Sequence, residues 1–453
     1  MAYRVVKSGS KYAVKKDGAQ RASKTFTSKA EADDYCDKMN GVSKEVRTIK
    51  KISKKKGGKA LIVVVAILLV AAAVTLFFLY KKGYIKLPSN NKKNLETFEG
   101  VTYEDFQIHF MMLGNDKAGD SIYIKAGDTD ILIDAGSTKG SASTLKSYIN
   151  NYCKDGILEY VIATHGDQDH ISAFTGNEGI FKSYECKTII DFEYTTKTTG
   201  TYNDYVSLRD EEVASGAKHY YASQCWNNEG GAQREYELSD KVTMSIIYNK
   251  YYFEKSDDEN NHSVCTLFTY TNNGESHYFL LTGDLEKKGE ESVAAYYDKS
   301  TKEKTLPEVD LFKAGHHGSK TSSNDCLLSL IKPQICVVSC CCGTDEYTEN
   351  IENQFPTQQF IDRIAKYTDR VYITSIYETY TVVKNTETGK LEINTDGFKA
   401  MNGNIIVSIG SENKVGLAAS NNLIKLKDTD WFKLEIEKDG TKQRVRTTPD
   451  EWK

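Results

Sequence analysis

The ten residues VIATHGDQDH, at positions 161–170, decide the fold of this chain. They begin as an apolar run, which predicts the end of a buried strand, and continue as a polar turn. Four side chains of the turn can bind a cation, and imidazole with carboxylate suits zinc, manganese or iron. Their spacing at i, i+2, i+4 and i+5 points them in several directions, so they can hold two neighbouring ions. These residues are His165, Asp167, Asp169 and His170.

Two later segments repeat the pattern of an apolar strand that ends in ligands. Residues 278–284, YFLLTGD, end in Asp284, a carboxylate placed after glycine where it can bridge two ions. Residues 310–322, DLFKAGHHGSKTS, deliver His316 and His317 at the end of another apolar strand. The sequence therefore predicts that three strand ends meet at one site.

These three segments, in this order, resemble the metallo-β-lactamase superfamily, whose signature is His-x-His-x-Asp-His. Asp167 stands where that signature has its second histidine. This variant, with the Leu-Leu-Thr-Gly-Asp and His-His-Gly-Ser runs, is similar to the hydrolase domain of ComEC-type DNA-uptake proteins. The resemblance covers about residues 103–410 and implies an α+β fold, an αββα sandwich with ligands at its strand ends.

The resemblance also implies a dinuclear centre with two divalent metal ions, zinc or manganese. A metal-bound hydroxide would attack phosphorus or a carbonyl carbon while the ions stabilise the developing charge. Asp169 would bind the second ion and orient the nucleophile. His316 would bind that ion too, and His317 would act beside it or transfer a proton. The expected metal ligands are His165, Asp167, Asp169, His170, Asp284 and His316, and the expected catalytic residues are Asp169 and His317.

Three further assignments accompany this expectation. His262 is a candidate ligand for the first ion, but ComEC-type domains usually have Asn-x-x-Ser there, which Asn260 and Ser263 match. Phe355 stands where the family usually has a histidine that stabilises the transition state. Three residues that could bind a phosphate through charge or hydroxyl donors follow His316 and His317. They are Ser319, Lys320 and Thr321.

A membrane helix is predicted over residues 60–80, which are apolar apart from Thr75 and long enough to cross a bilayer. Seven Lys and Arg residues precede it within residues 47–59 and five Lys follow it within residues 81–93. The excess predicts an N-terminus inside and a large domain outside the cytoplasm. Free cysteines in the large domain argue mildly for the opposite orientation.

These patterns divide the chain into six parts. A small ββα domain over residues 1–42 resembles a small bacterial domain of unknown function. A basic tether (43–59), the membrane helix (60–80) and a linker (81–100) lead to the hydrolase domain (101–411). The last part, residues 412–453, alternates apolar and polar residues and predicts a small β-rich appendage.

Charge is unevenly distributed, and it bears on the substrate. Residues 1–59 hold 17 basic and 6 acidic side chains, a net charge of +11. Because the whole chain has a net charge of −4, the remaining residues carry −4 − 11 = −15. An acidic bulk favours small substrates over long nucleic acids. The first hypothesis is a membrane-bound phosphodiesterase or nuclease, with the bilayer and a phosphodiester as partners and no defined protein partner. The alternatives are a hydrolase of amides, lactones or β-lactams, and a non-catalytic binding module.

Overall fold

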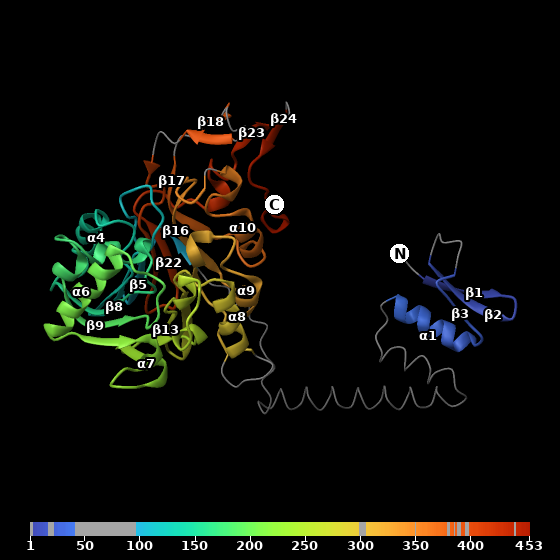
Figure 1. Cartoon of the computed structure of the whole chain (residues 1–453), viewed down its shortest axis with the longest axis horizontal. Coiled ribbons are helices and arrows are strands. Elements are labelled where there is room, and N and C mark those ends of the chain that lie inside the picture. The colour runs from blue at the N-terminus through green and yellow to red at the C-terminus, as the bar shows by residue number, and fades with distance from the viewer. Residues whose placement is uncertain are drawn as a thin grey trace. The chain divides into compact units, whose positions relative to one another are not determined.

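The computed structural model describes residues 3–16, 22–40, 97–298, 305–348, 350–377, 381–384, 386, 391–394, 398–438 and 441–453. Two compact units are distinguished, residues 1–94 and 95–453, and each is described by itself (Figure 1). The predicted membrane helix over 60–80 lies outside the described residues, as do the tether and most of the linker. Within the described part of the chain, no helix has the length and apolar character needed to span a bilayer.

The N-terminal unit is a three-stranded antiparallel sheet with one helix. Val14, Ala32 and Cys36 form its small core, since the apolar side chains of the strands and helix meet there. The sequence predicted two of the strands and the helix, and the structure adds a third short strand. Its elements are β1 (Tyr3–Ser8), β2 (Lys11–Lys16), β3 (Lys24–Phe26) and α1 (Lys29–Met39).

The large unit contains two mixed sheets packed face to face. The first has nine strands in the order β10-β9-β8-β7-β6-β5-β21-β22-β4. Its strands are β4 (Thr97–Glu99), β5 (Phe106–Phe110), β6 (Ile122–Ala126), β7 (Thr129–Ile133), β8 (Ile157–Ile162), β9 (Glu185–Asp191), β10 (Lys218–Tyr221), β21 (Ile405–Ile409) and β22 (Val415–Ala419).

The second sheet has eight strands in the order β11-β12-β13-β14-β15-β16-β17-β20. Its strands are β11 (Glu235–Ser239), β12 (Val242–Ile246), β13 (Thr266–Asn272), β14 (Glu275–Leu281), β15 (Leu311–Lys313), β16 (Ile335–Cys342), β17 (Val371–Tyr377) and β20 (Phe398–Lys399). Two hairpins stand apart from both sheets: β18 (Thr381–Lys384) with β19 (Leu391–Asn394), and β23 (Glu435–Lys438) with β24 (Thr441–Arg444).

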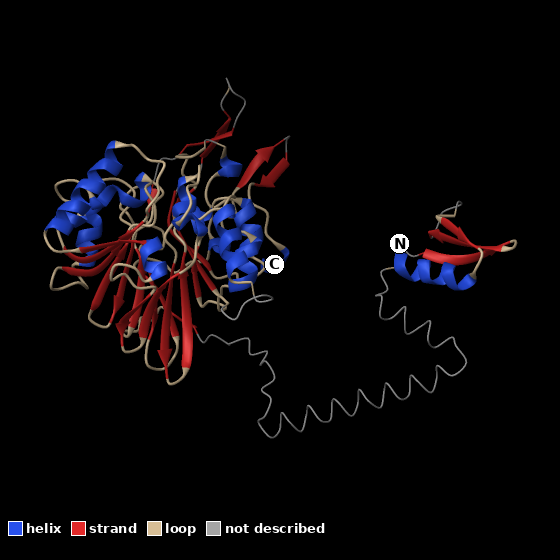
Figure 2. Ribbon diagram, turned by 60° about the horizontal axis from the view of Figure 1, so that its bottom comes forward, coloured by secondary structure: helices blue, strands red, loops and turns tan. Residues whose placement is uncertain are grey.

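Helices connect the strands and cover the outer faces of the sheets (Figure 2). The α-helices are α4 (Ser141–Ile149), α5 (Gln168–Ile171), α6 (Gly200–Ala214), α7 (Ala222–Asn227), α8 (Lys287–Tyr296), α9 (Asp325–Ile331) and α10 (Gln358–Ile364). Short 3₁₀ turns are η1 (Ser172–Phe174), η2 (Ile180–Lys182), η3 (Lys250–Tyr252), η4 (Glu259–His262), η5 (Gly315–Gly318), η6 (Ile351–Asn353), η7 (Leu426–Asp428) and η8 (Asp450–Trp452).

Three apolar cores show that the layers are α, β, β and α. The central core joins the two sheets, with Phe106 of β5 against Phe268 and Phe279 of the second sheet. A second core lies between the nine-stranded sheet and helices α4 and α6, around Leu145 and Tyr205. The third lies between the eight-stranded sheet and helices α8, α9 and α10. The predicted αββα sandwich is therefore confirmed.

The C-terminal segment is not the separate appendage that the sequence predicted over residues 412–453. Strand β22 pairs with β21 inside the nine-stranded sheet, and Trp431 and Trp452 belong to the helix-side core. Buried Arg446 donates to the backbone oxygens of Ile351 and Gln354, and its guanidinium lies 4.4 Å from the ring centroid of Trp431. Alternation predicted a β-rich segment here, and the structure places β22, the β23–β24 hairpin and the turns η7 and η8 in it; alternation could not show that β22 extends the main sheet.

Candidate metal centre

The strand ends that carry the predicted ligands meet at one edge of the sandwich. Strands β7, β8 and β9 run parallel in the first sheet, and β14 and β15 run parallel in the second. Parallel strands bring their carboxyl ends to the same edge of a sheet. Ligand-bearing turns therefore follow β8, β14 and β15 side by side.

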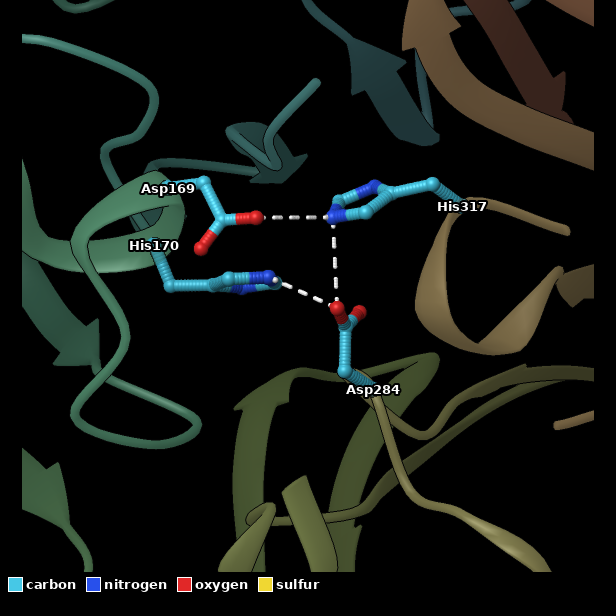
Figure 3. A group of neighbouring side chains, drawn as sticks. All are labelled: Asp169, His170, Asp284 and His317. Atoms are coloured by element: carbon cyan, nitrogen blue, oxygen red, sulfur yellow. Dashed lines mark hydrogen bonds and ion pairs between the residues drawn. The ribbon is translucent and has the colours of Figure 1, made fainter. Parts of the chain in front are cut away.

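Four side chains from these turns form a buried group (Figure 3). They are Asp169, His170, Asp284 and His317, and one ligand atom from each lies within 4.8 Å of the others. Asp284 Oδ2 lies 3.1 Å from His170 Nε2 and 3.2 Å from His317 Nε2. Asp169 Oδ2 lies 3.3 Å from His317 Nε2. Two imidazoles and two carboxylates suit zinc, manganese or iron.

Asp134, at the end of β7, holds His170 in position. Its Oδ2 lies 2.7 Å from His170 Nδ1, and the same carboxylate accepts from the N–H and hydroxyl of Thr164, each at 2.7 Å. A carboxylate on Nδ1 leaves Nε2 facing the group of four, which is how proteins orient a metal-binding histidine. Gly136 is required nearby, because a Cβ there would lie 1.5 Å from the Asp169 backbone oxygen.

The turn η5 decides which of the two adjacent histidines enters the group. His316 and His317 both adopt left-handed backbone conformations, with φ of 44° and 50°. Such strain in non-glycine residues is typical of functional sites. His317 Nδ1 donates to the Ser339 backbone oxygen at 2.8 Å, so its Nε2 faces Asp169 and Asp284. His316 instead places Nδ1 3.0 Å from Glu286 Oε1.

The sequence assigned the metal-binding role to His316, but His316 is not part of the group of four candidate ligands. His317, predicted to act beside the metal or in proton transfer, is the member of the buried group. Both histidines lie in a left-handed turn, in which the Ser339 carbonyl orients His317 toward the group and Glu286 engages His316. Sequence spacing alone does not distinguish the two residues.

We predict different effects for the two histidines. His317→Ala removes a ligand atom and should weaken binding of Mn²⁺ or Zn²⁺ by at least about 100-fold. His316→Ala removes contacts with Glu286, Asn260 and the neighbouring aromatic rings but no atom of the group of four, and should change the affinity by less than about tenfold. Competition titration against a fluorescent chelator measures both, and equal losses or the reverse order would contradict the assignment.

A buried ammonium group lies beneath the four ligands. Lys313, the last residue of β15, is fully buried, and its Nζ contacts Asp120, Asp284 Oδ1 at 3.0 Å and the Gly283 backbone oxygen at 2.9 Å. Burial would lower the pKa of this ammonium, but the two carboxylates outweigh that effect and raise it. Lys313 therefore remains charged and offsets part of the carboxylate charge of the site.

The same charges shift the pKa values of the candidate ligands. Burial would raise the pKa of Asp284, but His170, His317 and Lys313 hold it well below its ordinary value. Burial would lower the pKa of His170 and His317, but Asp284 and the neighbouring carboxylates hold both pKa values well above the ordinary value. A cation that binds at this position would replace protons on the two imidazoles.

His165 and Asp167 lie on the other side of His170. The rings of His165 and His170 are 4.2 Å apart, and His165 Nε2 lies 3.5 Å from Asp167 Oδ2. Lys197 forms an ion pair with the other oxygen of Asp167. The structure thus places both predicted ligands beside the group of four, but within the described residues neither one belongs to a cluster of three or more ligand atoms.

His262 is directed away from the centre, so the structure does not support its candidacy as a ligand. Its Nδ1 lies 3.2 Å from the Tyr251 backbone oxygen, and its Nε2 accepts from the Ser256 N–H at 3.3 Å. Ser263 occupies the nearer position, with its hydroxyl 3.5 Å from His165 Nδ1 and 3.1 Å from the Asp284 N–H.

Two of the three predicted phosphate contacts, Ser319 and Thr321, have other partners. The Ser319 and Thr321 hydroxyls lie 2.8 Å apart, and Thr321 donates to Glu286 Oε1 at 2.7 Å. Lys320 is exposed. Because both hydroxyls are engaged within the loop, they hold its shape rather than present free donors.

Tyr347 and Phe355 line the open side of the group. The Tyr347 hydroxyl donates to Asp169 Oδ2 at 2.7 Å, although about half of this side chain is exposed. Its ring lies 5.0 Å from that of Phe355, which in turn lies 6.4 Å from the His317 ring. Phe355 therefore does lie beside the site, and the nearby polar donor is Tyr347.

Unpartnered nitrogen atoms fit a metal ion. His165 Nε2 and His170 Nε2 are buried and make no hydrogen bond of good geometry among the described residues, although carboxylate oxygens of Asp167 and Asp284 lie 3.5 and 3.1 Å away. A buried polar atom without a partner costs free energy, which coordination to an ion would recover. The donor set and these atoms together make a His/Asp metal site plausible, and they leave the identity of the metal open.

Sequence reasoning missed five residues that shape the site: Asp120, Asp134, Lys313, Tyr347 and Lys197. Three of them had a visible signal, since a lone carboxylate borders an apolar strand at Asp120 and at Asp134, and Lys313 interrupts an apolar strand. Tyr347 and Lys197 lie in loops with no pattern that distinguishes them from surface residues.

Comparison with known proteins finds relatives of part of the chain. The chain is 27% identical over 244 residues to Recombination protein 2 of Haemophilus influenzae, which is 53% of this chain and 25% of that protein. It is 24% identical over 215 residues to ComE operon protein 3 of Bacillus subtilis, 47% of this chain and 23% of that protein. The chain thus spans about a quarter of the length of these relatives. It is related to ComEC-type competence proteins.

Two further comparisons concern the small unit and the fold. A family described as an uncharacterized protein conserved in bacteria, DUF2188, matches residues 3–44. The solved metallo-β-lactamase fold protein YhfI from Bacillus subtilis is 13% identical, with a TM-score of 0.29, over 59% of this chain and 86% of that one. The metallo-β-lactamase-like fold is recognised here from the sheet orders and the three cores.

Proposed function

We propose that this chain is a membrane-anchored, metal-dependent phosphodiesterase or nuclease. The observation that carries the proposal is the buried group of Asp169, His170, Asp284 and His317, oriented by Asp134 and the Ser339 carbonyl. A surface turn would not hold two imidazoles and two carboxylates so close in a buried place. A catalytic metal site needs this preorganisation.

The four residues would hold a divalent ion, zinc or manganese. When bound, such an ion lowers the pKa of water and neutralises charge on a phosphoryl oxygen. Asp169 would orient the attacking water, because its Oδ2 also accepts from Tyr347 and is fixed from two sides. The Tyr347 hydroxyl already donates to Asp169, so on the open side, where Phe355 has no donor, its role is to hold that carboxylate in place.

Phosphodiester substrates are supported by two observations. Lys197 places an ammonium group beside the four ligands, at Asp167, and an anionic substrate would be attracted to it. The relatives are named for recombination and competence, and the sequence resembles nuclease-like hydrolases. The acidic bulk of the large unit favours a small phosphodiester over a long nucleic acid.

A non-catalytic binding module is the second candidate, and Phe355 is the observation that favours it. The test is hydrolysis by the full chain in detergent with Mn²⁺ or Zn²⁺. Bis-p-nitrophenyl phosphate and a labelled oligonucleotide probe the proposal, and nitrocefin and a lactone probe other hydrolase classes. Metal-dependent phosphodiester cleavage is expected. Cleavage of only the other substrates, or of none while metal is bound, would contradict the proposal.

The membrane anchor is supported by the 21 largely apolar residues at 60–80 and the basic residues before them. The large unit would lie outside the cytoplasm, as the excess of preceding Lys and Arg favours. Alkaline extraction of membranes should leave the chain in the pellet, and external protease should degrade the large unit of intact spheroplasts. Release of the chain, or full protection, would contradict this placement.

A further inference from the structure

The two halves of the signature motif differ in the number of ligand atoms that surround them. Asp169 and His170 join Asp284 and His317 in a group of four ligands. His165 and Asp167, on the other side, lie 3.5 Å apart, and within the described residues no third ligand atom joins them in a cluster. The third position on that side is taken by Ser263, while His262 is engaged with Tyr251 and Ser256. A second ion would therefore find few protein ligands there.

A lysine ammonium already occupies this side. Lys197 Nζ forms an ion pair with Asp167 Oδ1, while Asp167 Oδ2 faces His165. The side chains of Lys197 and Asp167 are about three-quarters buried, with exposed fractions of 28% and 25%, so water screens the pair only partly. A divalent ion at Asp167 would have to displace this ammonium.

The loop that carries Lys197 is fixed to the strand end. Glu259, in η4, is buried, and its carboxylate accepts from the Gly166 N–H at 2.9 Å, from the Thr195 hydroxyl at 2.8 Å and from the Thr196 hydroxyl at 2.9 Å. One carboxylate therefore joins the His165–Asp167 turn to the segment just before Lys197. A Cβ on Gly166 would lie 2.7 Å from Glu259 Oε1, so the close approach requires glycine.

From these contacts we propose that the centre holds one divalent ion, on Asp169, His170, Asp284 and His317, and that Lys197 takes the place of a second cation. The ammonium neutralises Asp167 and binds a non-bridging oxygen of the phosphodiester. This deepens the proposed function and rests on it. The expected dinuclear centre is thereby replaced by one ion and one fixed ammonium group.

Metal stoichiometry tests this directly. The full chain in detergent, saturated with Mn²⁺ or Zn²⁺ and freed of excess ion, should contain one ion per chain by elemental analysis or native mass spectrometry. Lys197→His, which removes the ammonium and offers a third ligand beside His165 and Asp167, should bind two. Two ions in the unchanged chain, or only one in Lys197→His, would overturn the proposal.

A second measurement concerns the substrate. Lys197→Ala should leave the affinity for the first ion unchanged within about twofold, and should raise KM for bis-p-nitrophenyl phosphate by about tenfold or more. Lys187→Ala, an exposed lysine on β9 that pairs with Glu185, is the matched control and should change neither value. An unchanged KM in Lys197→Ala would overturn the contact with phosphate.

The outcomes separate this inference from the proposed function. A chain that binds no ion contradicts the hydrolase itself. A chain that binds two ions and cleaves phosphodiesters leaves the hydrolase in place and contradicts only the role of Lys197.

Discussion

Asp284→Asn is expected to remove the bound metal ion and to lower kcat/KM for a phosphodiester by about a thousandfold or more. Asp284 contacts three other residues of the site, because its Oδ2 faces both His170 and His317 and its Oδ1 accepts from Lys313. Asparagine keeps the shape of the side chain but removes its charge. The loss would therefore report the metal site and not a collapse of the fold.

Elemental analysis and initial rates, on the same preparation, measure this effect. Asp325→Asn is the matched control, since Asp325 is exposed on α9, pairs with exposed Lys366 and belongs to no cluster of ligand atoms among the described residues. It should retain metal and activity. Full metal content and full activity in Asp284→Asn would contradict the assignment of the centre.

Lys313→Met should lower the free energy of unfolding of the metal-free chain by about 3–5 kcal/mol, because it leaves buried carboxylates without their cation. Asp120 and Asp284 are both buried, and both contact the ammonium. Methionine fits the volume of the lysine stem, so the cost is mainly electrostatic. Saturating metal ion should recover part of the loss, since it offsets the charge of Asp284.

Tryptophan fluorescence in a urea titration measures this effect in the large unit alone, since Trp226, Trp431 and Trp452 are the chain's three tryptophans. Lys332→Met is the control, because Lys332 is exposed and pairs with exposed Glu308, a contact that contributes little. Equal midpoints for the two variants would show that the buried ammonium does not stabilise the fold.

The order of the elements around the site could be predicted from the sequence. Apolar runs that end in Asp or His gave β8, β14 and β15 and the turns that follow them, because buried parallel strands are continuous in apolar residues. The same reasoning brought His170, Asp169 and Asp284 to one edge. These residues share a short turn or a strand end, so local sequence is sufficient.

The positions of some residues depend on an unusual backbone conformation or on contacts with segments distant in the sequence, and these positions could not be predicted. The choice between His316 and His317 depends on two consecutive left-handed residues, which the spacing does not reveal. Asp120 and Lys313 meet across nearly two hundred residues, and only the packing of the two sheets brings them together. Strand β22 has the sequence VGLAA, which shows no alternation of apolar and polar residues, and its place beside β21 depends on tertiary pairing.

The metal content of the purified full chain tests the central claim most directly. After reconstitution with Mn²⁺ or Zn²⁺, we predict one tightly bound ion per chain, and loss of that ion in both Asp284→Asn and His317→Ala. A chain that binds no transition-metal ion, or retains it in both variants, would contradict a metal centre at Asp169, His170, Asp284 and His317.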